Sequence, residues 1–175
     1  MNVEIKIRKA TQQDRDALCQ IHVSAIRGLG ISHYSEAEVD AWSRGRTPER
    51  YEKHIAESYV IVAQHGSKPV GFGTLDYTTG EIRQVYVRPE YARKRIGLRI
   101  LRELLAEAKG RGLRGVHCLS SLNAEAFYAN SGFYAGQKCK HRFQNGGEID
   151  CIPMKKMLEP DAESAGSSNT PHSSQ

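Results

Sequence analysis

Residues 85–101 read VYVRPEYARKRIGLRIL, and this stretch decides the fold. It begins with three β-type residues and stops at Pro89, which has no backbone N–H to donate to a sheet ladder. Apolar residues then recur at helical spacing, and they are Ile96, Ile100, Leu101, Leu104, Leu105 and Ala108. The stretch therefore predicts a strand, a short turn and a helix over residues 94–110.

The turn between this strand and this helix is basic. It contains Arg93, Lys94 and Arg95, and Gly97 follows. The first N–H groups of a helix have no partner within the helix, and the helix dipole favours negative charge there. We interpret the turn as a phosphate-binding site. The alternative is a solvated basic loop in front of an ordinary helix.

A second informative segment lies at residues 120–133 and reads SSLNAEAFYANSGF. Ser121 is placed to cap the start of a helix, and Gly132 suits the left-handed conformation that ends one. Alanine and aromatic residues between them share one helical face. The pattern predicts a helix over residues 122–131.

Together the two segments resemble the GNAT superfamily of acetyl-CoA-dependent N-acetyltransferases, and the resemblance covers residues 3–158 in the order of elements. Members of that family carry Gln/Arg-x-x-Gly-x-Gly/Ala after a strand, and Asn-x-x-Ala-x-x-Phe-Tyr-x-x-x-Gly-Phe downstream. The second motif is matched by Ala124, Phe127, Tyr128, Gly132 and Phe133. Ala92 replaces the first Gln/Arg, Arg95 the first glycine, and Ser121 the Asn, with Asn123 two residues on. A side chain at Arg95 would crowd a closely approaching pyrophosphate, whereas a right-handed backbone there would still direct its N–H at the ligand.

The remaining pattern predicts an α/β fold with a mixed, mostly antiparallel central sheet flanked by helices. Expected strands are 3–7, 59–64, 70–76, 81–87 and 116–119, with a final hairpin of 133–143 and 149–157. Further helices are expected after the capping box at residues 11–14, over 35–42 and from Pro48. Residues 1–158 form one N-acetyltransferase domain in this interpretation. Residues 159–175, polar with three acids and no Lys or Arg, are expected to be a disordered tail.

Composition limits the functional classes. No apolar run approaches the ~18 residues of a transmembrane helix, and the N-terminus lacks the apolar region of a signal peptide, so we expect a cytoplasmic protein without membrane contact. The four cysteines lack metal-ligand spacing, so we expect buried free thiols and no metal. They are Cys19, Cys118, Cys139 and Cys151.

Basic residues concentrate in one part of the chain. The net charge is +5, and ten Lys and Arg lie within residues 83–114 against three acids. Such a concentration suits either nucleic acid or a cofactor that carries several phosphates. We favour the cofactor, because no nucleic-acid motif or aromatic interleaving accompanies the charge.

The resemblance implies that acetyl-CoA is the co-substrate and that it binds across both motifs. The residues implied are Val85, Tyr86, Val87, Arg93, Lys94, Arg95, Ile96, Gly97, Leu98, Ser121, Asn123 and Tyr128. It also implies that the strand splays from its neighbour near Tyr86 and Val87, which would free a backbone N–H for the oxyanion. The acceptor would be an amine of a small molecule or peptide, and the protein a monomer or homodimer.

Acetyl transfer to an amine needs a base for the amine and an acid for the leaving thiolate. Glu81 is our candidate base, at the position of a catalytic glutamate in some family members. Strand alternation predicts one shared face for Glu81, Arg83, Val85 and Val87. The alternative is a surface carboxylate paired with Arg83. Tyr128 is our candidate acid, beside the thioester sulfur by resemblance, and the alternative is a core tyrosine.

Three further hypotheses compete. An acyl-cysteine route through Cys118 is disfavoured, because the neighbouring His117 would point to the opposite face of the strand. A CoA-binding module without catalysis follows from the departures at Ala92 and Arg95, and a nucleic-acid-binding domain follows from the basic charge. For the acceptor, the regions expected to grip it offer His33, Tyr34, Glu36, Glu38, Asp40, Trp42, His141 and Arg142. The three acids near Trp42 suit a cationic amine or are simply the solvated side of a helix.

Overall fold

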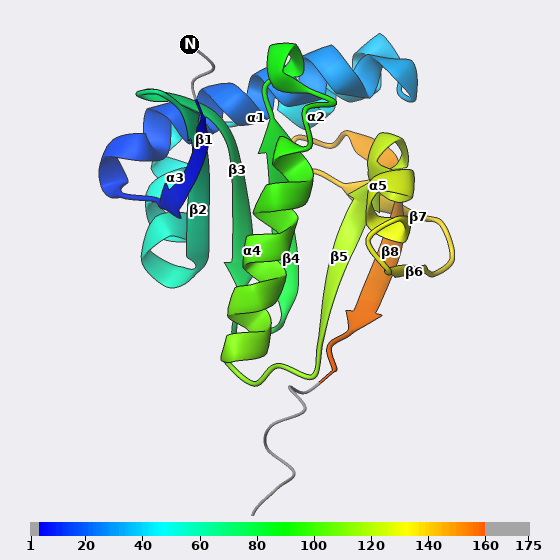
Figure 1. The fold of residues 1–175 in the computed structure, drawn as a ribbon. Helices are drawn as coiled ribbons and strands as arrows, with labels where there is room; N and C mark the ends of the chain where they lie inside the picture. The colour runs from blue at the N-terminus through cyan, green and yellow to red at the C-terminus, as the bar shows by residue number, and fades with distance from the viewer. Residues whose placement is uncertain (1–3, 160–175) are drawn as a thin grey trace, which may run out of the picture.

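The central sheet of the computed structural model, which describes residues 4–159, starts as an antiparallel meander (Figure 1). It runs through β1 (Ile5–Lys9), β2 (Tyr59–His65), β3 (Lys68–Asp76) and β4 (Glu81–Val87). β5 (Gly115–Ser121) then pairs in parallel with β4, and β8 (Glu148–Met157) pairs antiparallel with β5. The short strands β6 (Tyr134–Ala135) and β7 (Cys139–Arg142) both pair with β8. This order confirms a mixed, mostly antiparallel sheet.

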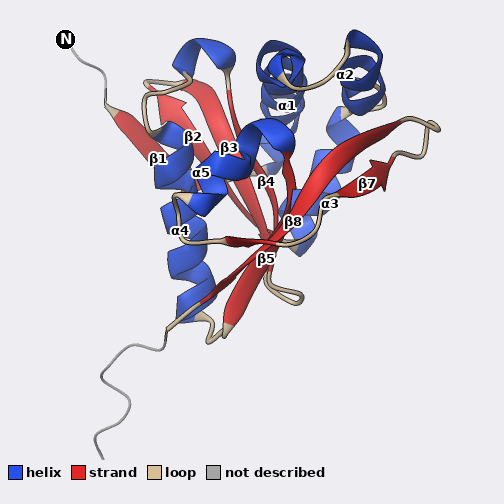
Figure 2. Cartoon of the chain, turned by 90° about the vertical axis from the view of Figure 1, so that its right-hand side faces the viewer, coloured by secondary structure: helices blue, strands red, loops and turns tan. Residues whose placement is uncertain are grey.

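Helices cover both faces of the sheet (Figure 2). The helix α4 (Ile96–Gly110) packs on one face, with α5 (Glu125–Ala129) beside it. The other face is covered by α1 (Arg15–Leu29), α2 (Glu36–Ser43) and α3 (Pro48–Glu57). The expected start signals are present, since the Thr11 N–H donates to Asp14 and the Ser35 N–H to Glu38. None of the helices in residues 4–159 has the length and apolar character that a bilayer crossing requires.

Glycine in β3 brings α4 close to the sheet. A Cβ atom on Gly73 would lie 2.4 Å from Ile100 and 2.9 Å from Leu104, both buried residues of α4. The missing side chain therefore lets Ile100 and Leu104 contact the strand backbone directly. This close packing holds α4 against the sheet.

The strands β4 and β5 separate soon after they meet. Their single paired position is Glu81 with His117, and the His117 N–H donates to the Gly80 carbonyl at 3.0 Å. Beyond this joint the carboxyl ends of the two strands diverge (Figure 1). The expected splay near Tyr86 and Val87 is therefore present.

A β-bulge corrects the expected alternation of β4. Thr74 pairs with Gln84 and Leu75 with Ile82, so Arg83 has no partner of its own on β3. Directly opposed residues share a face, and Ile82 joins Val85 and Val87 in the cluster under α4. Glu81 and Arg83 therefore do not share the face of Val85 and Val87. The prediction of one common face was wrong because alternation holds only where the ladder is regular.

The C-terminal region also departs from expectation. The strand expected over 133–143 is interrupted, because one extra residue separates the pairs Ala135 with Met154 and Cys139 with Cys151. Pro153 faces this interruption and has no N–H to continue the ladder. The helix expected over 122–131 is a 3₁₀ turn, Leu122–Ala124, followed by the short α5. Residue 3 and residues 160–175 lie outside the described residues, so the tail prediction stays a prediction.

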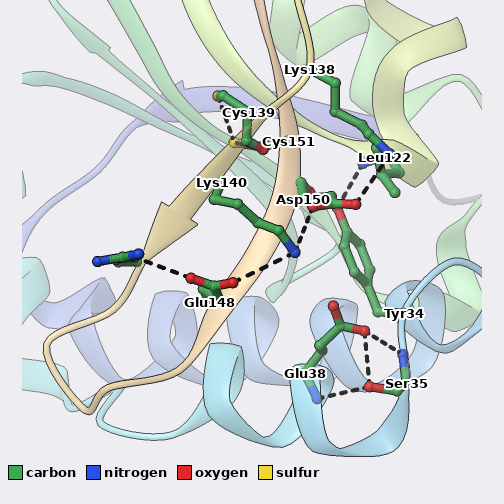
Figure 3. Close-up of polar contacts among 11 residues, drawn as sticks. Tyr34, Ser35, Glu38, Leu122, Lys138, Cys139, Lys140, Glu148, Asp150 and Cys151 are labelled. Carbon is green, nitrogen blue, oxygen red and sulfur yellow. Dashed lines mark hydrogen bonds and ion pairs between the residues drawn. The ribbon is translucent and has the colours of Figure 1, made fainter.

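Tyr34 joins three distant segments (Figure 3). It precedes α2, its hydroxyl donates to the Asp150 carbonyl of β8 at 2.7 Å, and it accepts from the Leu122 N–H at 2.7 Å. Burial, the largest effect, raises the pKa of this phenol. Tyr34 therefore holds the wall of α1 and α2 against the region where β5 ends.

We expect the Tyr34→Phe variant to lose about 1–3 kcal/mol of unfolding free energy, because a buried N–H and a buried carbonyl lose their partner. Tyr134→Phe is the matched control, since Tyr134 is 72% exposed. Urea denaturation of both variants measures the difference. Equal stability of the two variants would show that the Tyr34 hydroxyl contributes nothing to the fold.

Candidate active site

A cavity of about 650 Å³ opens where β4 and β5 diverge. Its wall combines the end of β4, the β4–α4 turn, the start of α4, the segment after β5, and parts of α1 and the C-terminal hairpin. Every predicted site residue lines this cavity except Lys94, whose Nζ atom lies 4.9 Å from the centre of the Tyr91 ring. Residues that are far apart in the sequence therefore meet in one place.

The β4–α4 turn presents a row of free amides. Within residues 4–159, the N–H groups of Arg93, Lys94 and Arg95 have no hydrogen-bond acceptor. The first amides of α4 follow directly and are unsatisfied by helix geometry. Such a row, with the helix dipole behind it, is suited to phosphate groups.

Arg95 has an uncommon backbone conformation in this turn. Its backbone is left-handed, with φ 60°, and Arg93 has φ 60° as well. The right-handed backbone considered for Arg95 is therefore not the one that the structure adopts. A left-handed residue with a side chain costs about 1–2 kcal/mol, which accounts for the glycine that the family motif carries here. The Arg95 carbonyl accepts the Arg99 N–H at 3.1 Å, so α4 begins directly at this left-handed residue.

Gly97 lies in the first turn of α4. A Cβ atom there would meet Phe127 at 3.6 Å and Val87 at 3.7 Å, which are ordinary contacts, so a side chain is sterically tolerated. We expect Gly97→Glu to weaken acetyl-CoA binding by about tenfold or more, because it adds negative charge at the amide row. Gly97→Gln, matched in size, isolates the charge. Calorimetry that gave both variants wild-type affinity would place the phosphates elsewhere.

Two amides of β4 face the gap between the strands. The Arg88 N–H donates to the Val70 carbonyl of β3, and amide directions alternate along a strand. The N–H groups of Val85 and Val87 therefore point toward β5, which pairs with β4 only at Glu81. These amides are directed at the cavity and are suited to an oxyanion.

Tyr128 belongs to α5 and is 6% exposed. Its ring makes edge-to-face contacts with Phe127 at 5.0 Å and Phe133 at 5.2 Å. Burial, followed by charge on Cys118, raises the pKa of its phenol well above the ordinary value. The hydroxyl has no hydrogen-bond partner in residues 4–159, and Tyr128 lines the cavity. Tyr128 therefore keeps its proton near neutral pH and presents it to the cavity.

Asn123 and Ser121 lie at the end of β5 and line the same cavity. The Asn123 Oδ1 atom is buried without a partner in the described residues, which is costly unless a ligand completes its hydrogen bond. Ser121 was expected to cap a helix, but its side chain makes no capping bond. The neighbouring Leu122 N–H is bonded to Tyr34 instead.

Glu81 lines the cavity at the joint of β4 and β5. Its Oε2 atom accepts from Arg83 Nε at 3.1 Å, and Arg83 also donates to Asp76 at 2.6 Å. The candidate base and the alternative ion pair are thus present together. Arg83 divides its hydrogen bonds between Glu81 and Asp76. The Glu81 carboxylate therefore remains available to a ligand.

The cysteines differ in exposure. Cys118 is buried, and burial raises its pKa to about 12, while His117 is exposed on the other face of β5. The geometry thus disfavours an acyl-cysteine route. Cys151 is also buried, but Cys139 is exposed and Cys19 half-buried, so the expectation of four buried thiols was wrong. No cluster of acidic, His and Cys side chains suited to a metal is found in residues 4–159.

The basic residues of 83–114 are spread over several elements. Arg99 donates to the Ile5 carbonyl, Arg88 to the Pro69 carbonyl, and Arg111 pairs with Glu107. Arg93 and Arg95 line the cavity. Several of the charges therefore have structural partners, and those at the turn serve a pocket rather than a broad surface.

The acceptor half of the cavity differs from expectation. Of the residues expected to grip the acceptor, only Trp42 and His141 line it. Glu38 binds Ser35 in the capping box, and Asp40 pairs with Arg27 and Arg44. Sequence reasoning missed His22 and Arg46, which do line the cavity. The position of His22 within the apolar stripe of α1 was the signal in the sequence that could have indicated its role.

Comparison with known proteins places the fold and the cavity in context. Residues 31–158 match the family model described as an acetyltransferase (GNAT) domain. An uncharacterized N-acetyltransferase of Escherichia coli, YafP, is 28% identical over 74% of this chain and 81% of its own length. A spermidine N(1)-acetyltransferase of Thermoplasma acidophilum is 25% identical over 73% of this chain and 88% of its own.

Solved structures show the same architecture. A GCN5-related N-acetyltransferase from Rhodopseudomonas palustris superposes with a TM-score of 0.83 and 25% identity, covering 90% of this chain and 98% of that one. The PaiA N-acetyltransferase of Thermoplasma acidophilum, solved with coenzyme A, gives 0.72 and 22% identity over 89% and 99%. The chain therefore belongs to the GNAT acetyltransferase family and is an acetyl-CoA-dependent N-acetyltransferase.

Proposed function

We propose that the cavity binds acetyl-CoA along β4 and α4 and that the acetyl group passes directly to a primary amine of a small molecule or peptide. The observation that carries the proposal is that three features lie in one cavity. They are the free amides of the β4–α4 turn, the free amides of β4, and the side chains Glu81 and Tyr128.

The cofactor is expected to lie with its phosphates on residues 93–98 and its pantetheine arm in the gap between β4 and β5. The unpartnered Asn123 Oδ1 atom would accept a hydrogen bond from an amide of that arm. Bound acetyl-CoA supplies the activated acyl group as a thioester.

The remaining chemistry falls to the chain. Glu81 takes the proton of the acceptor amine, directly or through one water, so that the neutral amine attacks. The Val85 and Val87 amides stabilise the oxyanion, because they are fixed before the reaction begins. Tyr128 donates its proton to the departing sulfur. The burial that raises the pKa of Tyr128 also raises that of a thiol bound beside it, so the transfer stays feasible.

The family assignment disfavours the two alternatives that the sequence raised, and each would behave differently in solution. A CoA-binding module without catalysis would bind acetyl-CoA but release no thiol, and a nucleic-acid-binding domain would bind in a salt-sensitive way without stabilisation by acetyl-CoA. One relative is named as a spermidine N(1)-acetyltransferase, and spermidine is an amine. That name supports an amine acceptor in general. A cytoplasmic location, a monomeric or homodimeric state and the absence of a metal stay predictions.

The test is steady-state release of free CoA thiol across a panel of primary amines. The proposal predicts release that depends on one or more amines and that yields the acetylated product by mass. A protein that binds acetyl-CoA yet acetylates no amine would instead be the binding module.

A further inference from the structure

Arg46 is a cation without an anion in the acceptor half of the cavity. It lies in the connection between α2 and α3, is half-buried and lines the cavity. Its Nε atom donates to the Trp42 carbonyl at 3.3 Å, and no carboxylate in residues 4–159 pairs with its guanidinium. Arg83, by contrast, is held by both Asp76 and Glu81. A half-buried guanidinium without a counter-ion is poised for an anionic ligand.

His22 supplies a second unpartnered polar group in the same part of the cavity. It is 2% exposed and lines the cavity, and its Nε2 atom has no partner in the described residues. Its Nδ1 atom lies 2.8 Å from the Tyr51 hydroxyl, which has no other hydrogen-bond partner there. The buried phenol is satisfied when it donates to Nδ1, and this tautomer places the ring proton on Nε2. His22 is then a donor that lacks an acceptor.

His22 and Tyr86, two cavity-lining groups that sense the charge of Arg46, carry no charge of their own. Burial is the main cause that lowers the pKa of His22, and Arg46 lowers it further. Burial also raises the pKa of Tyr86 to about 12, an effect that Arg46 opposes. The imidazole and the phenol are thus neutral near neutral pH. Among the described residues that line the cavity, Glu81 is the single carboxylate, and it is paired with Arg83.

We propose that Arg46 and His22 form a carboxylate-binding subsite, so that the acceptor is an amine that also carries a carboxylate. This inference rests on the proposed function and names its substrate class. A guanidinium binds a carboxylate through parallel N–H bonds, and a neutral imidazole N–H adds a third donor. The acids that suited a cationic acceptor, Glu36, Glu38 and Asp40, do not line the cavity.

The experiment compares acceptors that differ only in the carboxylate. The pairs are glycine with methylamine, γ-aminobutyrate with propylamine, and lysine with cadaverine. Thiol release is measured with each at saturating acetyl-CoA. We expect at least one carboxylated acceptor to exceed its partner amine by about tenfold to a hundredfold in kcat/KM, the range of charge-assisted hydrogen bonds.

Variants locate the source of that preference. Arg46→Gln should remove it by raising KM for the carboxylated acceptor, and Arg46→Lys should restore part of it, because lysine keeps the charge without the planar fork. Arg44→Gln is the matched control, since Arg44 is exposed, pairs with Asp40 and does not line the cavity. All three variants should keep wild-type acetyl-CoA affinity.

Several results would overturn the subsite. They are equal or better acetylation of the partner amines, an Arg46→Gln loss that is the same for both members of a pair, and no acetylation of any carboxylated acceptor. Each leaves the proposed function standing when acetyl-CoA still binds and some amine is acetylated. A protein that neither binds acetyl-CoA nor releases thiol fails at the proposed function itself.

Discussion

The Tyr128→Phe variant is expected to lose about 10²- to 10⁴-fold in kcat while it binds acetyl-CoA almost as tightly as the wild type. The substitution keeps the ring and its contacts with Phe127 and Phe133, so the packing of α5 is preserved. It removes only the proton that the phenol presents to the cavity. The large effect is expected because the leaving sulfur then loses its proposed proton donor.

Tyr134→Phe serves as the control for this measurement, because it removes the same hydroxyl group from a tyrosine on an exposed strand. Single-turnover rates of both variants separate chemistry from product release. Wild-type kcat in Tyr128→Phe would return Tyr128 to the role of a core tyrosine. A large loss in acetyl-CoA affinity would instead assign its hydroxyl to cofactor binding.

The Glu81→Gln variant is expected to show the second large effect, on kcat/KM. If Glu81 deprotonates the bound ammonium, kcat/KM rises with pH to a plateau, and the variant lowers that plateau by about 10²-fold or more. A loss under about tenfold with an unchanged pH profile would assign the proton to water. A higher KM with kcat little changed would mean that Glu81 grips the substrate.

The ion pair with Arg83 requires its own control. Asp76 is the other carboxylate on Arg83, and it does not line the cavity. Asp76→Asn therefore weakens the second ion pair of Arg83 and keeps the Glu81 carboxylate itself. We expect this variant to keep its plateau, and an equal loss in both variants would trace the effect to Arg83 instead.

The elements of the fold were largely predictable because periodicity and caps are local properties. The Ser35–Glu38 capping box, Pro48 at the start of α3 and the apolar stripe of α4 all indicated their helices correctly. The β4–α4 turn was predictable for the same reason, since strand, turn and helix are contiguous in the sequence. Every feature of this kind rests on residues close together in the chain.

Features that depend on pairing between strands were not predictable. The bulge at Arg83 depends on the register with β3, and the interruption between β6 and β7 depends on Pro153 of β8. The left-handed backbone of Arg95 is set by the path from β4 into α4. In each case a tertiary constraint overrides the local preference.

The acceptor side of the site was the least predictable part. His22 and Arg46 belong to different elements, and nothing in their local sequence indicates that they line one cavity. The acids near Trp42 were the more visible signal, yet they form a cap and surface ion pairs. The proposed acceptor subsite depends on how α1 and the α2–α3 connection pack against β4.

Thermal unfolding of the wild-type protein with and without acetyl-CoA tests the central claim most directly. A ligand that binds only the folded state at 100 times its dissociation constant adds about 2.7 kcal/mol to the unfolding free energy. The account predicts a melting temperature that rises progressively with acetyl-CoA concentration. An unchanged melting temperature at millimolar acetyl-CoA would contradict it.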